Sequence, residues 1–368
     1  MTTPRETSGP PTTENCRFCW MCRHACPVGH VTHRETYTPH AWALTIESVK
    51  RGQLEWNAET VDVMYACADC GLCQAHCATD QPLPDAIASA RAGIVSAGMA
   101  PAVVSELDQQ FARFASAYGT AAPVRGTLTG PVAVYVGDAA HHLTPAAAEA
   151  AVRLLQAAGL NPFPIGIGRS SGWLASSVGL QSRAVELAHA VTEEVIASGA
   201  REVLVLSAAD RWAFEHVYSA RLGVTWPEGV VVREVVDVLA AALESGQLRL
   251  RGPATEVPFA YHDPCHAPRL ERDTAAPRAL LKAALGENAA RPLFWREGRA
   301  HPCGAIGGLE LTHPAIAASL AASRFTDAKS AGARWLITED PACFHYLSTR
   351  APEGLEVRNL FELLVARA

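Results

Sequence analysis

Eight of the eleven cysteines fall into two short runs with the same spacing. The first run contains Cys16, Cys19, Cys22 and Cys26, and the second contains Cys67, Cys70, Cys73 and Cys77. A Cys-x2-Cys-x2-Cys-x3-Cys loop can wrap three thiolates around one [4Fe–4S] cluster while the fourth thiolate binds a second cluster. We therefore expect two [4Fe–4S] clusters with crossed ligands, namely cluster 1 on Cys16, Cys19, Cys22 and Cys77, and cluster 2 on Cys67, Cys70, Cys73 and Cys26.

Zinc is the alternative for these runs. Structural zinc sites usually take their four ligands from two separated pairs, whereas each run here supplies four thiolates by itself. Pro27 follows the first run, and Ala78 stands at the equivalent place after the second. The pattern favours two clusters, and two neighbouring clusters are suited to passing single electrons.

The other three cysteines stand alone in the second half of the chain. They lie in YHDPCH (261–266), HPCGAIGG (301–308) and DPAC (340–343). Three thiolates with one oxygen or nitrogen ligand can hold a third iron–sulfur cluster or zinc. Buried cysteines that bind no metal are the alternative. The predicted site comprises Cys265, Cys303, Cys343 and Asp340, with His262, His266 and His301 as other candidates for the fourth ligand.

The composition is that of an ordinary globular protein. The 368 residues are 49% hydrophobic and 18% charged, and the net charge of −6 gives no basic footprint for nucleic acid. No run of 18 apolar residues is present. Residues 1–15 lack the apolar stretch of a signal peptide and are expected to be disordered. We expect a cytoplasmic protein, with peripheral association at the inner face of the cell membrane left open.

The pattern of elements divides the chain in two. Residues 16–118 are predicted to form a helix-rich module, with helices at 38–49, 58–65, 83–96 and 101–118, followed by a linker at 119–130. From residue 131, β-branched runs alternate with alanine-rich helices, which predicts an α/β fold. Strands are expected at 132–136, 202–206, 258–261 and 334–337, and helices at 145–158, 183–198, 234–244, 314–331 and 360–367.

The α/β half also shows an internal duplication pattern with a period of roughly 130 residues. VAVYVGD (132–138) matches VPFAYHDPC (257–265), and VREVVDVLAAAL (232–243) matches VRNLFELLVARA (357–368). We therefore predict two tandem domains, 131–252 and 253–368. The positions that match the cysteines of the second copy hold none in the first, so we expect no cluster there; these positions are Asp138, Ser170, Ser171, Asp210 and Ala213.

The motifs at 261–266, 303–308 and 340–343 resemble the CCG cysteine-rich domains of the heterodisulfide reductase family. Joined to a dicluster ferredoxin module, their order is similar to the iron–sulfur subunits of glycolate oxidase and of anaerobic glycerol-3-phosphate dehydrogenase. Pro302 and Asp340 stand where that family carries cysteines. The resemblance implies an electron-transfer subunit that takes electrons from a flavoprotein dehydrogenase acting on a 2-hydroxy acid or glycerol 3-phosphate, and that passes them to quinone or another acceptor.

Two other functions stay open at this point. One is a catalytic reductase whose substrate binds a cluster or metal in the second CCG domain. The other is a docking scaffold in which only the ferredoxin module is redox-active. The chain shows no dinucleotide-binding fingerprint, so a flavin is expected on a partner protein.

Overall fold

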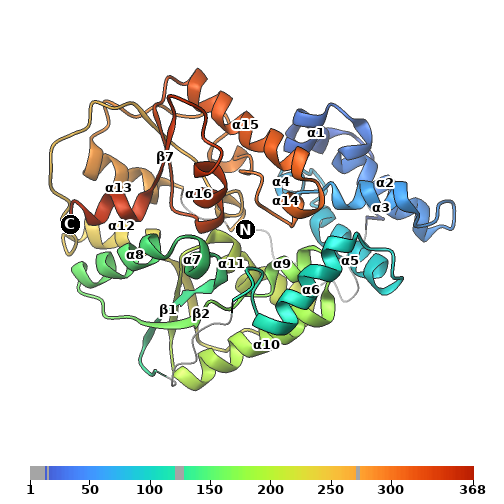
Figure 1. Ribbon diagram of the computed structural model, residues 1–368, viewed down its shortest axis with the longest axis horizontal. Helices are drawn as coiled ribbons and strands as arrows, with labels where there is room; N and C mark the ends of the chain where they lie inside the picture. The colour runs from blue at the N-terminus through green and yellow to red at the C-terminus, as the bar shows by residue number, and fades with distance from the viewer. Residues whose placement is uncertain (1–12, 15, 121–127, 271–273) are drawn as a thin grey trace.

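The computed structural model describes residues 13, 14, 16–120, 128–270 and 274–368. It is a mixed α/β structure in which a helical N-terminal region lies beside two parallel sheets (Figure 1). Most of the predicted lead-in and linker falls outside the described residues. The strands are β1 (Val132–Val136), β2 (Phe163–Ile167), β3 (Glu202–Val205), β4 (Val231–Glu234), β5 (Phe259–Tyr261), β6 (Trp335–Thr338) and β7 (Glu356–Asn359).

The N-terminal region contains only helices among its described elements. They are η1 (Met21–Ala25), α1 (Pro27–Thr32), η2 (Glu35–Tyr37), α2 (Pro39–Lys50), α3 (Ala58–Tyr65), α4 (Leu72–Ala75), α5 (Leu83–Ser96) and α6 (Ala102–Phe114). Asn57 caps α3 by accepting hydrogen bonds from the Glu59 and Thr60 N–H groups. The helices α5 and α6 pack on α9 and α10 of the next region, so the two regions share a core.

The α/β half supplies the remaining helices. The first set is α7 (Gly137–Leu143), α8 (Pro145–Ala157), α9 (Trp173–Ser177), α10 (Gln181–Ser198), α11 (Ala208–Trp212), the π-helix η3 (Ala213–Leu222) and α12 (Val235–Glu244). The second set is η4 (Ala267–Arg269), α13 (Ala275–Leu285), η5 (Glu297–Arg299), α14 (Leu309–Thr312), α15 (Pro314–Ser330), α16 (Pro341–Ser348) and α17 (Leu360–Val365).

Three strands of the first sheet have the same order along the chain as the three strands of the second. The first is β2-β1-β3-β4 and the second is β5-β6-β7, with every neighbouring pair parallel. In β1, Ala133 and Tyr135 point into one core and Val134 into the other, as expected for a strand covered on both faces. The orders β1-β3-β4 and β5-β6-β7 correspond in sequence order, and β2 has no counterpart among the described strands. The duplication itself stays a prediction.

A layer of helices separates the two sheets. Helix α8 packs on α17, and α12 packs on α13. Leu154 of α8 and Leu239 of α12 join Leu280 of α13 and Phe361 of α17 in one core of buried residues. This layer fixes the two α/β units so that the carboxyl ends of β1, β3, β5 and β6 can all contribute residues to one region, as described below.

Several elements were anticipated and others were missed. The strands at 132–136, 202–205, 259–261 and 335–338 confirm the predicted ones to within a residue at each end, and α5 matches its predicted range. Strands β2, β4 and β7 and helices α13 and α16 were not predicted. Strand β2 has the sequence FPIGI, and its proline is tolerated because β2 lies at the edge of its sheet.

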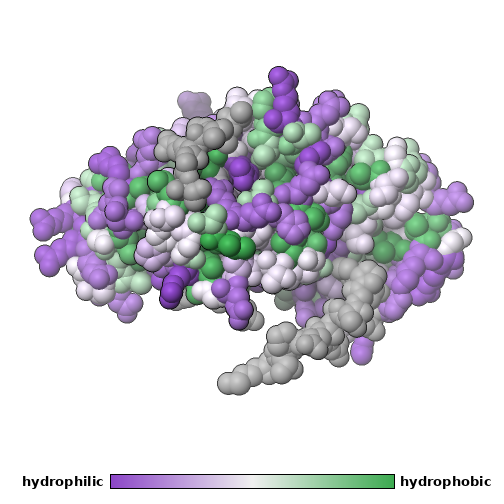
Figure 2. All heavy atoms as spheres, turned by 90° about the horizontal axis from the view of Figure 1, so that it is seen from below, coloured by the Kyte–Doolittle hydropathy of each residue, from purple (hydrophilic) through white to green (hydrophobic). Residues whose placement is uncertain are grey.

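Among the described residues, the surface shows no gathering of apolar side chains on the face seen in Figure 2. On the face seen in Figure 2, hydrophilic and hydrophobic side chains are interspersed, so apolar groups on that face are scattered rather than gathered in one patch. None of the helices in the described ranges is both long and apolar enough to cross a bilayer.

A buried ion-pair network joins the N-terminal region to η3. The Arg221 guanidinium donates to both carboxylate oxygens of Asp69, at 2.8 and 2.9 Å, and to Asp85 at 2.7 Å. All three side chains are at most 5% exposed. Burial alone would raise the pKa of Asp85, but Arg221 and His216 outweigh it and lower that pKa. The network therefore holds two ionised carboxylates inside the protein.

We predict that Arg221→Met lowers the free energy of unfolding by about 3–5 kcal/mol, because it leaves two buried carboxylates without their partner. Anaerobic urea unfolding followed by circular dichroism measures the change. Arg358→Met is the matched control, since Arg358 pairs with Glu356 at the surface, and it should cost less than about 1 kcal/mol. Equal effects of the two substitutions would contradict the prediction.

Candidate functional site

The first cysteine group lies near the surface of the N-terminal region. Cys16, Cys19 and Cys22 precede or open η1, which packs on α4, and Cys77 follows α4. Burial and the neighbouring thiolates of Cys16, Cys77 and Cys19 raise the pKa of Cys22 to about 11. These four thiols are thus close enough to repel one another as thiolates. Cys19 is exposed, and the adjacent Trp20 and Met21 are 52% and 57% exposed.

Three cysteines of the second group, Cys26, Cys67 and Cys70, are buried, and Cys73 is partly exposed. Cys67, Cys70 and Cys73 lie between α3 and the start of α4, and Cys26 caps the N-terminus of α1. Burial, followed by the thiolates of Cys70 and Cys67, raises the pKa of Cys26 well above its ordinary value. The pKa of Cys73 is raised by burial and by Cys67, Cys70, Cys26 and also Cys22, so the two groups adjoin.

The two groups that the fold assembles have the membership expected for crossed ligation. Buried thiols crowded in this way keep their protons unless a cation compensates the thiolates. Four sulfur donors in each group fit a [4Fe–4S] cluster. Whether each cysteine is a ligand stays a prediction.

The loop between Cys67 and Cys70 is held from three sides by arginines. Arg91 of α5 donates to the Cys67 carbonyl oxygen at 2.7 Å, Arg221 binds the Asp69 carboxylate, and Arg269 of η4 donates to the Cys70 carbonyl oxygen at 3.3 Å. The side chain of Arg91 is completely buried and also donates to the Ser177 carbonyl oxygen at 2.8 Å. Each part of the chain therefore contributes one arginine to this loop, a feature that the sequence pattern did not reveal.

The third group of cysteines gathers at the carboxyl ends of β5 and β6. Ligand atoms of His262, Cys303 and Cys343 all lie within 4.8 Å of one another, and all three residues are buried. A hydrogen bond with Cys303 and burial raise the pKa of Cys343. Burial lowers the pKa of His262 to about 3, so its ring is neutral at pH 7. Its Nε2 has no hydrogen-bond partner in the described part of the chain.

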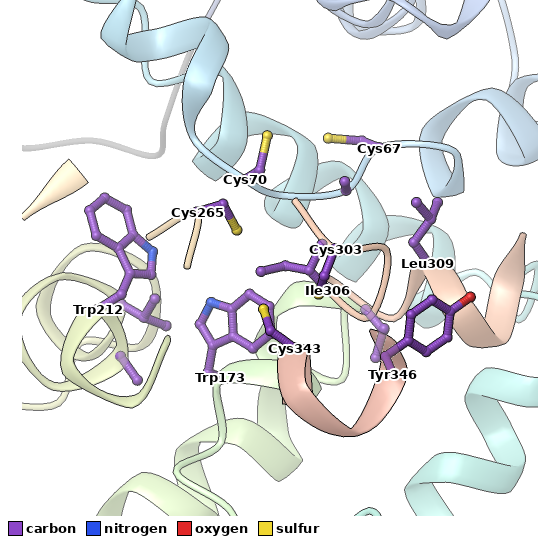
Figure 3. Packing of buried hydrophobic residues seen from close by; sticks show 14 of the residues in the cluster. Cys67, Cys70, Trp173, Trp212, Cys265, Cys303, Ile306, Leu309, Cys343 and Tyr346 are labelled. Atoms are coloured by element: carbon purple, nitrogen blue, oxygen red, sulfur yellow. The ribbon is translucent and has the colours of Figure 1, made fainter. Parts of the chain in front are cut away.

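Cys265 lies between the second group and this trio (Figure 3). Burial raises its pKa, and the thiolates that add to the effect are those of Cys70 and Cys303. The second cluster group thus leads into the CCG region without an intervening domain boundary. Two sulfurs and one imidazole nitrogen with an open position suit zinc, whereas a third iron–sulfur cluster would also need the Cys265 thiolate; both assignments stay predictions.

The other candidate ligands have different surroundings. Asp340 caps α16, because its carboxylate accepts hydrogen bonds from the Cys343 N–H at 3.0 Å and the Ser207 hydroxyl at 2.7 Å. His266 Nε2 lies 2.9 Å from the Asp69 carbonyl oxygen, and its Nδ1 has no partner among the described residues. His301 stacks on Trp295 with ring centroids 4.0 Å apart. Among the described histidines, His262 alone joins two cysteines at ligand distance.

A cavity of about 80 Å³ lies between the two α/β units. The first α/β unit lines it with Asp138, Ser170, Ser171 and Asp210, the positions predicted to match the cysteines of the second unit. The second α/β unit contributes Cys265 and Cys343. Neither lysine nor arginine is among the described lining residues. Burial raises the pKa of Asp138 to about 6, and burial with the charges of Asp138 and Asp340 raises that of Asp210 to about 7.

Comparison with known proteins finds two matching domain families in this chain. A 4Fe-4S dicluster domain model matches residues 12–80, and a cysteine-rich CCG domain model matches residues 259–348. The chain is 24% identical over 319 residues to one subunit of the dihydromethanophenazine:CoB–CoM heterodisulfide reductase of Methanosarcina barkeri. This match covers 82% of the chain and 76% of that protein.

Two further likenesses are more limited. The chain is 28% identical over 160 residues to a probable membrane-anchored ferredoxin of Chromohalobacter salexigens, which is 41% of this chain but only 23% of that protein. The crystal structure of a hypothetical protein from Helicobacter pylori superimposes with a TM-score of 0.65 at 10% identity, over 94% of this chain and 71% of that one. The latter likeness shows the fold.

We predict that His262→Ala or Cys303→Ser removes the metal of the third group and leaves the iron of the two clusters in place. Each substitution takes away one of only three ligand atoms that lie close together in the described part of the chain. Iron and zinc content of anaerobically purified protein measures the effect. Ser170→Ala is the control, since Ser170 lines the same cavity on the copy without cysteines, and it should change neither metal.

The acidic cavity predicts a pH dependence of stability. Asp210 has a folded-state pKa of about 7 against an ordinary value of 3.8, so between these values the folded state binds more protons than the unfolded state. Stability should therefore fall as pH rises from about 4 to 7.

Asp210→Asn should reduce this loss, with a difference on the order of 1–3 kcal/mol between pH 5 and pH 7. Anaerobic urea unfolding at the two pH values measures it, and Glu149→Gln on the exposed side of α8 is the control. A slope in Asp210→Asn that equals that of the unsubstituted protein would show that Asp210 is ionised in the folded state.

Proposed function

Because the chain belongs to the iron–sulfur oxidoreductase subunits that join a dicluster domain to a CCG cysteine-rich domain, we propose that it relays electrons within a complex of several subunits. The observation that carries the proposal is the continuous series of cysteine groups, from exposed Cys19 through the buried second group to Cys265. Clusters bound in the first two groups would each take up and release one electron.

The protein's own residues give this series two different ends. At the first group, Cys19, Trp20 and Met21 are open to solvent, so a redox partner can approach there. At the second group, Cys67 and Cys70 are buried, and water is kept from the thiols. Electrons can therefore enter or leave at the first group, while the second passes them inward toward Cys265.

The partner is proposed to be a flavoprotein dehydrogenase that oxidises a 2-hydroxy acid or glycerol 3-phosphate, with quinone or another redox carrier as acceptor. The similarity to the iron–sulfur subunits of glycolate oxidase and glycerol-3-phosphate dehydrogenase supports this choice. We propose that the protein works in the cytoplasm, in peripheral contact with the membrane through its partners.

Reduction of a small molecule in the cavity is a second candidate function. The cavity adjoins Cys343 and carries carboxyl groups whose raised pKa values keep protons available near pH 7. A relative of this chain belongs to a heterodisulfide reductase, which supports reductive chemistry there. One observation counts against this candidate. The first α/β unit has polar residues at the positions predicted to match cysteines, so only the second unit can supply thiol ligands.

We predict that Cys70→Ala abolishes electron transfer, because a cluster that loses one of four thiolate ligands is destabilised. Anaerobic protein without substitutions should contain about eight irons per chain in two clusters that dithionite reduces, by EPR. Cys70→Ala should lose at least half of that iron and should no longer carry electrons from a reduced flavoprotein to a quinone analogue.

Cys303→Ser separates the candidate functions. Loss of electron transfer with both clusters intact would assign the third group to the relay or to catalysis. Loss of binding to a partner protein, with reduction of both clusters unchanged, would favour a docking scaffold.

Retention of two reducible clusters in Cys70→Ala would overturn the assignment of cluster 2.

A further inference from the structure

Arg269 lies directly against the cysteine loop of the second group. Its side chain crosses Gly71, where a Cβ atom would meet the Arg269 Cγ at 3.4 Å. The guanidinium donates to three carbonyl oxygens, those of Cys70 at 3.3 Å, Gly298 at 3.0 Å and Ala300 at 3.2 Å. Among the described residues, backbone carbonyl groups thus fix the orientation of this side chain.

Among the described residues, the groups that face the charge of this arginine are mainly thiols. None of the carboxylates in the described ranges forms an ion pair with Arg269, although the neighbouring Asp263 pairs with Arg278 at 2.8 Å. Burial lowers the pKa of Arg269, and the groups that oppose this effect most strongly are the thiolates of Cys70, Cys265 and Cys73. Arg269 is therefore a cation placed between the second cysteine group and Cys265 of the third.

Arg91 also forms no ion pair among the described residues, but it is completely buried and lies at the Cys67 carbonyl, away from Cys265. Two other arginines near the cysteines are paired with acids. Arg221 is balanced by Asp69 and Asp85. Arg23, next to Cys22 of the first group, pairs with Glu35 at 2.6 Å, and both side chains are more than 40% exposed. Arg269 is half-buried and has no ion-pair partner among the described residues. Of the described arginines that lack such a partner, it is the one that adjoins cysteines of two groups, the second and the third.

We propose that Arg269 is the shared counter-charge of cluster 2 and of the third cysteine group, and that it raises the reduction potential of cluster 2. This inference rests on the proposed cluster ligands. One-electron reduction adds one negative charge to the cluster, and a nearby guanidinium stabilises that charge more than it stabilises the oxidised form. If the two groups hold clusters, an electron gained by cluster 2 would be the one lost by cluster 1, and the guanidinium would stabilise the charge that it brings.

The position of Arg269 gives the relay a direction. An electron held on cluster 2 is stabilised on the side that faces Cys265, because that is where the guanidinium lies. Arg269 thus acts as a positioning residue that favours the electron at the inner end of the ferredoxin module, beside the third group. Its hydrogen bond to the Cys70 carbonyl also holds the ligand loop, so charge and structure must be separated by experiment.

The test is an EPR-monitored redox titration of the anaerobic holoprotein. Arg269→Gln removes the charge and keeps hydrogen-bond donors, whereas Arg269→Lys keeps the charge. We expect Arg269→Gln to lower the ratio of reduced to oxidised cluster 2 at least tenfold at a fixed potential, which is a midpoint shift of about 59 mV for one electron. Arg269→Lys should stay close to the unsubstituted protein, and Arg23→Met should leave the cluster 2 midpoint unchanged.

The midpoint is read from whatever fraction of the protein carries clusters, so incomplete loading does not obscure it. An Arg269→Gln midpoint equal to that of the unsubstituted protein would overturn the proposal. Loss of the cluster 2 signal from both Arg269 variants would assign this residue to structure alone and would also overturn it. If the unsubstituted protein itself lacked two reducible clusters, the proposed function would fail first, and the two failures are thereby distinguished.

Discussion

Thiolates inside a protein must be compensated by positive charge or by hydrogen-bond donors, and the architecture of this chain follows from that requirement. The four residues from Cys67 to Cys70 are all buried, in a place where uncompensated negative charge is costly. Arg91, Arg221 and Arg269 converge on this segment from three different parts of the chain. The loop is consequently both the predicted cluster site and the point at which the ferredoxin module and the two α/β units are joined.

The two cysteine groups of the module differ in their surroundings, although their sequence spacing is identical. The first is open to solvent at Cys19 and is flanked by the exposed Trp20 and Met21. The second is enclosed and faces Cys265. Identical spacing sets what each group can bind, whereas exposure and nearby charge set how readily each bound cluster is reduced. A relay needs both kinds of environment, one accessible to a partner and one directed inward.

The sequence predicted the parts of this site that depend on local spacing. The dicluster motif, the CCG motif and most strands of the α/β half could be recognised from periodicity and cysteine positions. The relative positions of Cys265, Cys303 and Cys343 could be anticipated only as a group, because they depend on how β5, β6 and their loops pack. The sequence pattern suggested Asp340 as a ligand, but the fold uses its carboxylate to cap α16, and His262 lies within ligand distance of two cysteines.

The three arginines were not foreseen for a related reason. Their contacts with the cysteine loop include residue pairs 24 and 199 positions apart, and arginine by itself carries no motif. Trp20 is half exposed, because the loop around Cys19 lies at the surface. Such features depend on tertiary packing and surface position, which local pattern does not encode.

The α/β unit that precedes residue 253 has no cysteines after Cys77, yet it makes three contributions to the site. It supplies Arg221 to the Asp69 carboxylate, the Ser177 carbonyl oxygen to Arg91, and half of the wall of the acidic cavity. Asp138 and Asp210 line the same cavity as Cys265 and Cys343, so carboxyl groups and thiol groups share one cavity. The α/β unit without cysteines thus supports the cysteine loop and places carboxyl groups with raised pKa values in the cavity beside the thiol groups.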